Sequence, residues 1–220
     1  SYLLMSSLDI SRRNLALNGE ASFEKVMKMA SYAREEINGI GDYYAYGKEL
    51  INGTSVYDFD VTKLAVYTRD LGLAGIEVYD LLRDEYNIQI EFGDISNILA
   101  YVSIGDRLQD IERLVGALYD LKRLYKRDKA GMLSAEYVSP KVAVPPRKAF
   151  YSDKVSLPLQ EAEGKVCTEF VMCYPPGIPI LAPGELITRD IIEYIVYAKA
   201  KGCSMQGTED FAVERLNVLK

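Results

Sequence analysis

The stretch from residue 173 to residue 185 reads CYPPGIPILAPGE, and its residue types are the best suited in the chain to contacting a small molecule. Its prolines restrict the backbone, so it loses little conformational entropy when a ligand binds, and Gly177 permits a conformation that other residues cannot hold cheaply. Its last residue, Glu185, offers a carboxylate just ahead of a predicted helix. That carboxylate could face a cationic ligand, or it could complement the positive N-terminal end of the helix. Composition alone favours a structural turn over a binding site, and both interpretations stay open at this point.

The sequence contains no histidine, which excludes every mechanism in which this chain itself would supply an imidazole. Its three cysteines are Cys167, Cys173 and Cys203, and no two of them form a CxxC pair. We therefore expect reduced thiols, as in a cytoplasmic protein, and no disulfide framework or metal site.

Charge excludes further classes of function. The 220 residues include 26 Lys and Arg against 32 Asp and Glu, for a net charge of −6. Such a chain has no excess of cations to neutralise phosphate groups, so neither nucleic acid nor an anionic membrane is an expected partner. It also lacks an uninterrupted apolar run of about 18 residues, the length that would predict a membrane-spanning helix.

The elements that position residues 173–185 follow from the spacing of apolar residues. Spacings of three and four predict helices over 21–38, 75–86 and 106–125, the first with Ser22 as N-cap and Gly39 just past its end. Runs rich in β-branched and aromatic residues predict strands over 43–46, 61–68, 88–92 and 98–104.

Prolines change the character of the chain after residue 125. Residues 126–165 are interpreted as a linker with a short helix near 146–152. The remaining predicted elements are a strand over 166–172, a proline-rich loop over 173–185, a helix over 188–200 capped by Thr188, and a strand over 214–219. Alternating helices and strands indicate an α/β or α+β chain of two subdomains.

Short stretches in a fixed order carry a resemblance to a known family. They are SYLLMSSLD (1–9), LGLAG (71–75), SIGD (103–106), YPPGIP (174–179) with PGE (183–185), and QG (206–207). With them, the sequence resembles the C-terminal half of the bacterial ornithine/lysine/arginine decarboxylases. These are pyridoxal-phosphate enzymes with the aspartate-aminotransferase fold. The start at Ser1, with an apolar run directly after it, agrees with our interpretation that the chain is the C-terminal part of a longer protein.

The resemblance implies three segments. Residues 1–20 would end the large domain, residues 21–128 would form the small domain, and residues 129–220 would form a linker and the C-terminal α/β domain. The cofactor lysine of the family follows a histidine in a Ser-x-His-Lys context, so this histidine-free chain lacks it. Pyridoxal phosphate is therefore expected in the full-length enzyme and not on this chain alone.

The resemblance also implies roles for four residues. Ser1 and Tyr2 would belong to the segment that reaches the cofactor phosphate of the neighbouring subunit. Glu185 and Tyr174 are the candidates for contacting the cationic end of a basic amino acid.

The implied function is that of a fragment of a basic amino acid decarboxylase of polyamine biosynthesis. Arginine is the preferred substrate, giving agmatine and CO₂, with lysine and ornithine left open. Expected partners are the substrate, the missing N-terminal and large domains, and a second subunit of a homodimer. We expect the fragment alone to be inactive. The alternative is a non-catalytic, stand-alone interaction module related to the same family.

Overall fold

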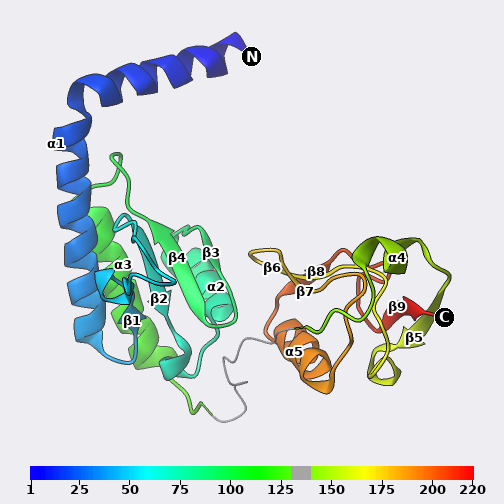
Figure 1. Cartoon of the computed structure of the whole chain (residues 1–220). Coiled ribbons are helices and arrows are strands. Elements are labelled where there is room, and N and C mark those ends of the chain that lie inside the picture. The colour runs from blue at the N-terminus through cyan, green and yellow to red at the C-terminus, as the bar shows by residue number, and fades with distance from the viewer. Residues whose placement is uncertain (130–139) are drawn as a thin grey trace.

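The computed structural model describes residues 1–129 and 140–220 (Figure 1). The first part of the chain is built on a four-stranded antiparallel sheet of order β1-β2-β4-β3. Its strands are β1 (Tyr44–Ala45), β2 (Lys63–Tyr67), β3 (Phe92–Gly93) and β4 (Asn97–Tyr101). Its helices are α1 (Tyr2–Ile40), α2 (Gly75–Tyr86) and α3 (Leu108–Tyr125).

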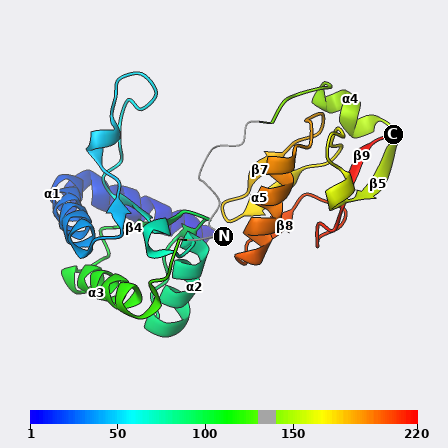
Figure 2. The same ribbon diagram turned by 90° about the horizontal axis from the view of Figure 1, so that it is seen from below.

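Burial along the two central strands alternates, as it does in a sheet packed on one face. Leu64 and Val66 of β2 are buried, and so are Ile98 and Ala100 of β4. Helices α1 and α3 lie side by side near this sheet (Figures 1 and 2). Both helices bury residues at spacings of three and four: Val26, Ala30, Ala33, Ile37, Ile111, Leu114, Leu118 and Leu121. The apolar periodicity of the sequence therefore marks most of the core, although four residues that share it are exposed: Phe23, Met27, Leu108 and Leu124.

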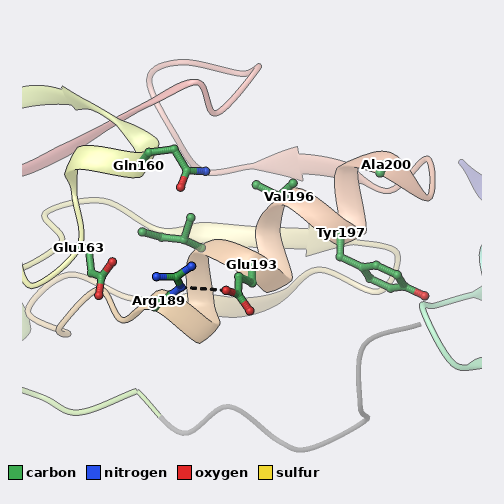
Figure 3. Close-up of a pocket in the computed structure, with 8 residues that line it drawn as sticks. Gln160, Glu163, Arg189, Glu193, Val196, Tyr197 and Ala200 are labelled. Carbon is green, nitrogen blue, oxygen red and sulfur yellow. Dashed lines mark hydrogen bonds and ion pairs between the residues drawn. The ribbon is translucent and has the colours of Figure 1, made fainter. Parts of the chain in front are cut away.

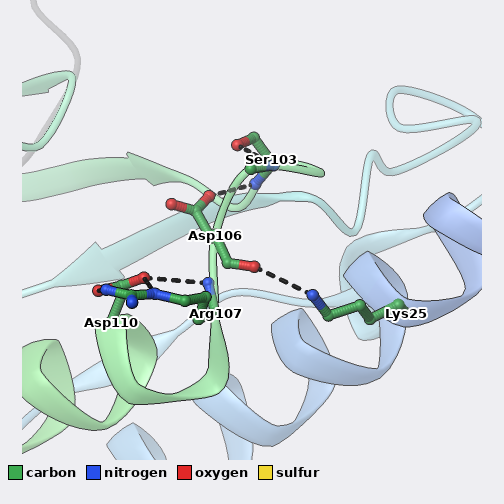
Figure 4. A network of polar contacts seen from close by, with 6 residues as sticks. Lys25, Ser103, Asp106, Arg107 and Asp110 are labelled. Carbon is green, nitrogen blue, oxygen red and sulfur yellow. Dashed lines mark hydrogen bonds and ion pairs between the residues drawn. The ribbon is translucent and has the colours of Figure 1, made fainter. Parts of the chain in front are cut away.

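The start of α3 is fastened to α1 by polar contacts (Figure 4). The Asp110 carboxylate accepts a hydrogen bond from the Arg107 backbone N–H at 3.0 Å, and Asp106 accepts one from the Ser103 N–H at 2.6 Å. Lys25 of α1 donates to the Asp106 carbonyl at 3.3 Å. The bond from Arg107 satisfies an N-terminal donor that has no partner inside the helix, and the bond from Lys25 joins α1 to the start of α3.

The guanidinium of Arg34 holds both ends of the long connection between β1 and β2 by hydrogen bonds. Arg34 of α1 donates to the Tyr46 carbonyl at 2.6 Å, to the Val61 carbonyl at 2.7 Å and to the Lys63 carbonyl at 3.0 Å. The pKa of Arg34 is lowered, chiefly by burial. The residues between these anchors are mostly exposed and contain a turn at Asn52.

The second part of the chain holds two small antiparallel sheets. Strands β5 (Lys154–Pro158) and β9 (Arg215–Leu219) form a two-stranded ribbon. Strands β6 (Val171–Tyr174), β7 (Ile178–Leu181) and β8 (Ser204–Gln206) form a sheet of order β7-β6-β8. The helices are α4 (Pro146–Tyr151) and α5 (Arg189–Ala200), and α5 buries Ile191, Ile192, Ile195 and Ala198. Short 3₁₀ turns occur at Lys48–Leu50, Arg69–Leu71 and Leu159–Glu161.

The two parts touch through the start of α2. Ala74 and Ile76 are buried within the hydrophobic cluster of the second part. Glu77 accepts the Ala74 N–H at 2.8 Å and pairs with Lys201, which follows α5, at 3.2 Å. The same carboxylate pairs with Arg127 at 2.7 Å. Glu77 thus joins the start of α2, the end of α3 and the end of α5.

The mixed α/β class predicted from the sequence is confirmed, and every strand pair of the described residues is antiparallel, which makes the chain α+β. No helix in residues 1–129 or 140–220 combines the length and the apolar character needed to cross a membrane. The proposed segment boundaries at residues 20 and 128 stay a prediction.

Several elements differ from the sequence-based expectation. Helix α1 begins at Tyr2, far ahead of the predicted Ser22 cap, and it ends at Ile40, with Gly41 at φ of 75° as its C-cap in place of the predicted Gly39. The predicted strand 88–92 is reduced to β3, because Asn87 ends α2 in the left-handed region and the Ile88 N–H bonds back to Leu82. The predicted linker contains strand β5, and strand β8 was not predicted.

Candidate functional site

The proline-rich stretch is a β-hairpin and not the loop that its composition predicts. Strand β6 continues through Tyr174, and β7 returns antiparallel to it after Pro175, Pro176 and Gly177. The Gly177 N–H closes the turn on the Cys173 carbonyl at 2.8 Å. Pro179 is tolerated inside β7 because β7 is an edge strand, where a missing N–H donor leaves no gap in the ladder.

Tyr174 lies at the tip of this hairpin. Its side chain is 48% exposed, and Ile178, just beyond the turn, is 66% exposed. The Ser204 hydroxyl of β8 donates to the Tyr174 carbonyl at 3.3 Å, which anchors the backbone and leaves the ring free. The tip therefore presents an aromatic and an aliphatic side chain outward on a rigid support.

Glu185 lies past the opposite end of the hairpin, in a tight turn. Its carboxylate accepts a hydrogen bond from the Ala182 N–H at 2.7 Å, and its own N–H bonds to the Ala182 carbonyl at 3.2 Å. The Cys167 N–H donates to the Glu185 carbonyl at 2.9 Å. One carboxylate oxygen is thus bound in the turn, and within residues 1–129 and 140–220 the second oxygen of this half-buried side chain makes no hydrogen bond, which leaves it able to accept one.

A separate segment of the chain, at Ala143 and Val144, supports this turn. Gly184 has φ of 94°, and its carbonyl accepts hydrogen bonds from the N–H groups of Ala143 at 2.8 Å and Val144 at 3.1 Å. A Cβ added at Gly184 would lie 2.1 Å from the Val144 carbonyl oxygen, so only glycine fits this approach. The sequence letters PGE therefore encode a turn whose carboxylate position is fixed by its neighbours.

The structure does not bring Tyr174 and Glu185 together. Val171 of β6 pairs with Leu181 of β7, and Glu185 lies four residues beyond that end, whereas Tyr174 is at the other end. Four residues of strand span about 10 Å or more. Within this chain the two residues lie at opposite ends of the β6–β7 hairpin. Their roles in binding stay predictions.

Ser1 and Tyr2 occupy the first turn of α1. Ser1 makes no side-chain hydrogen bond as N-cap, and Tyr2 is 87% exposed. In Figure 1 this end of α1 extends away from the rest of the described chain. Their predicted position at the cofactor phosphate of a neighbouring subunit stays a prediction.

A hollow lies elsewhere, along the outer face of α5 (Figure 3). It has a volume of about 680 Å³. Its lining residues are Gln160, Glu163, Arg189, Ile192, Glu193, Val196, Tyr197 and Ala200. Arg189 and Glu193 pair along the α5 side of it at 3.0 Å, and Glu163 adds a further carboxylate to the lining. Neither Tyr174 nor Glu185 lines it, and residues 1–129 and 140–220 contain no cluster of three His, Cys, Asp or Glu side chains suited to a metal.

Sequence reasoning missed one functional-looking carboxylate, Glu169. It is 7% exposed and accepts hydrogen bonds from the Asn217 N–H at 2.8 Å, the Asn217 amide at 3.1 Å and the Glu209 N–H at 3.0 Å. All of these donors belong to the protein, so Glu169 holds the structure together. No local pattern signals such a residue, because its partners are 40 and 48 positions away.

Comparisons with known proteins agree with the family inferred from the motifs. The model of the Orn/Lys/Arg decarboxylase C-terminal domain matches residues 129–210. An arginine decarboxylase of Bacillus anthracis is 40% identical over 100% of the chain, which covers 45% of that protein. An arginine decarboxylase of Bacillus subtilis is 39% identical over 100% of the chain and 46% of its own length. The chain thus spans less than half the length of the curated relatives it matches.

Solved structures show the same fold at low sequence identity. The constitutive lysine decarboxylase of Escherichia coli superposes with a TM-score of 0.69 at 16% identity, over 100% of this chain and 44% of that one. The Francisella novicida lysine decarboxylase gives a TM-score of 0.63 at 18% identity, over 91% of this chain and 40% of that one. Over its whole length, the chain is therefore related to the C-terminal half of the ornithine/lysine/arginine decarboxylase family.

Proposed function

We propose that the chain is the C-terminal portion of a basic amino acid decarboxylase and supplies part of its substrate-pocket wall. The observation that carries this proposal is identity of 39 to 40% over the whole chain with relatives named arginine decarboxylase. Arginine is accordingly the preferred substrate, with agmatine and CO₂ as products and a place in polyamine biosynthesis. Lysine and ornithine are the other candidates.

Pyridoxal phosphate, when bound in the full-length enzyme, would accept the electrons left behind as CO₂ departs. The residues of this chain would act on the rest of the substrate. We assign Glu185 to the distal cation, because a half-buried carboxylate with one oxygen already fixed needs little reorganisation to accept a charge-assisted hydrogen bond. Tyr174, on the exposed tip, would pack against the aliphatic stem of the substrate or against the neighbouring domain.

The replacement Glu185→Gln in the full-length enzyme tests this assignment. Glutamine keeps an oxygen that can accept the Ala182 N–H, so the turn is retained while the negative charge is lost. We expect kcat/KM for the preferred basic amino acid to fall by about tenfold or more, which is the scale for loss of a charged hydrogen bond. Steady-state CO₂ release measures it.

The control is Glu161→Gln, which alters an exposed carboxylate outside the hairpin and its turn. This variant should retain the kinetics of the parent enzyme. Unchanged kinetics in Glu185→Gln, with the fold intact by circular dichroism, would remove Glu185 from the binding site but leave the decarboxylase assignment standing.

The proposal also assigns a partner to the first half of α1. Its large apolar side chains are exposed by 64 to 87% at Tyr2, Leu3, Leu4 and Met5 and by 70% at Leu8. Monomeric proteins seldom leave such a patch uncovered. We assign it to contact with the large domain of the same protein, as the family relationship suggests, within a dimer whose sites lie between subunits.

Mixing experiments test this part of the proposal. The 220-residue chain alone should show no CO₂ release from arginine, lysine or ornithine and no cofactor absorbance that survives dialysis against buffer.

Co-expression with the preceding half of a relative such as the Bacillus subtilis arginine decarboxylase should give a complex, and Leu4→Glu with Leu8→Glu should weaken it. Stoichiometric cofactor retained by the chain alone would contradict the proposal. The alternative, an interaction module, would be favoured if the chain binds a full-length relative but restores no activity when it is combined with the preceding half.

A further inference from the structure

Cys173 lies in β6, and Cys203 directly precedes β8, the neighbouring strand in the β7-β6-β8 sheet. Cys173 of β6 is opposite Met205 of β8 in the antiparallel register. Cys203 precedes Met205 by two residues, so its side chain is on the same face of the sheet, because side chains alternate along a strand. Both are buried, with exposed fractions of 6% for Cys173 and 5% for Cys203.

The two thiols also influence each other's ionisation. A hydrogen-bonding contribution from Cys203 lowers the pKa of Cys173, and the reciprocal contribution from Cys173 raises the pKa of Cys203. The arrangement makes Cys173 the better nucleophile and places Cys203 as the second thiol that could resolve an oxidised Cys173.

The third cysteine provides a contrast within the same chain. Cys167 is 0% exposed, and its thiol donates to the Glu169 carbonyl at 3.1 Å. Burial raises its pKa to about 11. A protonated, fully enclosed thiol bonded to a backbone oxygen is a poor nucleophile.

We propose that Cys173 and Cys203 form a peroxide-sensitive dithiol that closes to an intramolecular disulfide joining β6 to β8. In the first step the Cys173 sulfur attacks one oxygen of hydrogen peroxide. The S–O bond forms as the O–O bond breaks, and hydroxide leaves. In the second step the Cys203 sulfur attacks the Cys173 sulfur, the S–S bond forms, and the S–O bond breaks to release a second hydroxide. The two thiol protons convert both hydroxides to water, and the two electrons lost by the sulfurs reduce the peroxide.

The sheet allows the closure with a small movement. Diagonal neighbours in an antiparallel pair have Cα atoms about 7–8 Å apart, against about 5.5–6 Å for most disulfides. Strand β8 therefore has to shift by about 1–2 Å toward β6. It is an edge strand, and it follows Gly202, which has φ of 90° and open space around its Cα, so this segment is the one best able to move.

The disulfide would act on the hairpin described above. Cys173 directly precedes Tyr174, and β8 already holds the hairpin through the bond from Ser204 to the Tyr174 carbonyl. Oxidation would replace this weak anchor by a covalent one and would fix the hairpin tip. The chemistry of the pair does not depend on the proposed decarboxylase function.

Peroxide titration of the 220-residue chain tests the proposal. We expect the native chain to lose two of its three titratable thiols, counted by alkylation in denaturant, with a loss in mass of two hydrogen atoms. Proteolysis should yield one linked pair of peptides, containing Cys173 and Cys203, and thiol reduction should restore both. Cys167 should remain alkylated in full.

Three variants sharpen the test. Cys167→Ser should form the same disulfide, which makes it the matched control. Cys203→Ser should stop with one oxygen atom on Cys173, trapped by a sulfenic-acid reagent such as dimedone, and Cys173→Ser should leave Cys203 unreacted. The proposal is overturned if the native chain keeps all three thiols under peroxide concentrations that oxidise free cysteine. It is equally overturned if the only products are links to Cys167 or between chains.

Discussion

Glu169 shows how hydrogen-bond donors allow a polar side chain to be buried. Three N–H donors from Asn217 and Glu209 surround its carboxylate, which is 7% exposed. A buried carboxylate is tolerated when hydrogen bonds replace the water that it loses. Glu169 thereby links the turn at Glu209 to strand β9, which pairs with β5.

Replacement of Glu169 by alanine should lower the free energy of unfolding by about 3 kcal/mol, because buried N–H donors lose their acceptor. Glu169→Gln, which keeps one acceptor oxygen, should cost about 1 kcal/mol. Urea denaturation measures both. The exposed Glu214→Ala should stay within about 0.5 kcal/mol of the parent chain. Equal stability of the parent and Glu169→Ala would show that water replaces the carboxylate at no cost.

The candidate site was predictable from the sequence only in part, at the level of single residues. Glu185 and Tyr174 stand out because their neighbours are prolines and glycines, and that signal is local. The sequence could not show that the two residues lie at opposite ends of a hairpin, because strand β7 carries Pro179 and looks like a loop. It could not show that one Glu185 oxygen is already bound to Ala182 either.

At the scale of elements, helices α2, α3 and α5 and several strands were predictable, whereas strands β5, β7 and β8 were not. Helix α2 has the bounds that the sequence indicates, since the spacing of its apolar residues is contained within the helix itself. Strand β5 exists because it pairs with β9, whose residues lie more than fifty positions away. Such a pairing leaves no mark on the local pattern, and the segment was therefore interpreted as linker.

The turn that carries Glu185 makes a prediction about glycine at this scale. Gly184→Ala should destabilise the chain by about 2 kcal/mol or more, because the new Cβ would meet the Val144 carbonyl oxygen at a left-handed position. Gly164→Ala is the matched control. Gly164 has φ of 75° with nothing within 4 Å of its added Cβ, so this variant should lose only about 1 kcal/mol. Thermal and urea unfolding compare the two, and equal losses would contradict the steric argument.

At the scale of the whole molecule, contacts at the start of α2 couple the two parts of the chain. Ile76 is buried against the second cluster, and Glu77 holds Lys201 and Arg127 at the same point. Asp42, just past α1, makes a similar link inside the first part through Lys126 at 2.7 Å and Lys122 at 3.1 Å. Hydrogen bonds from Lys126 and then Lys122 hold the pKa of Asp42 below the usual aspartate value of 3.8.

A pKa that is depressed by folding gives the whole chain an acid-sensitive increment of stability. The increment is complete above the ordinary aspartate pKa and disappears as the pH falls through the lower pKa of the folded state. Asp42→Asn should therefore be less stable than the parent at pH 7, by about 1 kcal/mol or less, and equally stable at strongly acidic pH. Asparagine tolerates the φ of 62° at this position. Urea unfolding from neutral to acidic pH measures the difference. Asp153→Asn should show none, and a difference independent of pH would exclude the ionic cause.

The clamp made by Arg34 has a practical consequence for protein engineering. Because Arg34 fixes the chain at Tyr46 and again at Val61 and Lys63, the exposed residues in between can be exchanged without disturbing the strands on either side. A foreign epitope or a short recognition peptide grafted there would have both of its ends held in place by Arg34. Its display would not depend on the original loop sequence.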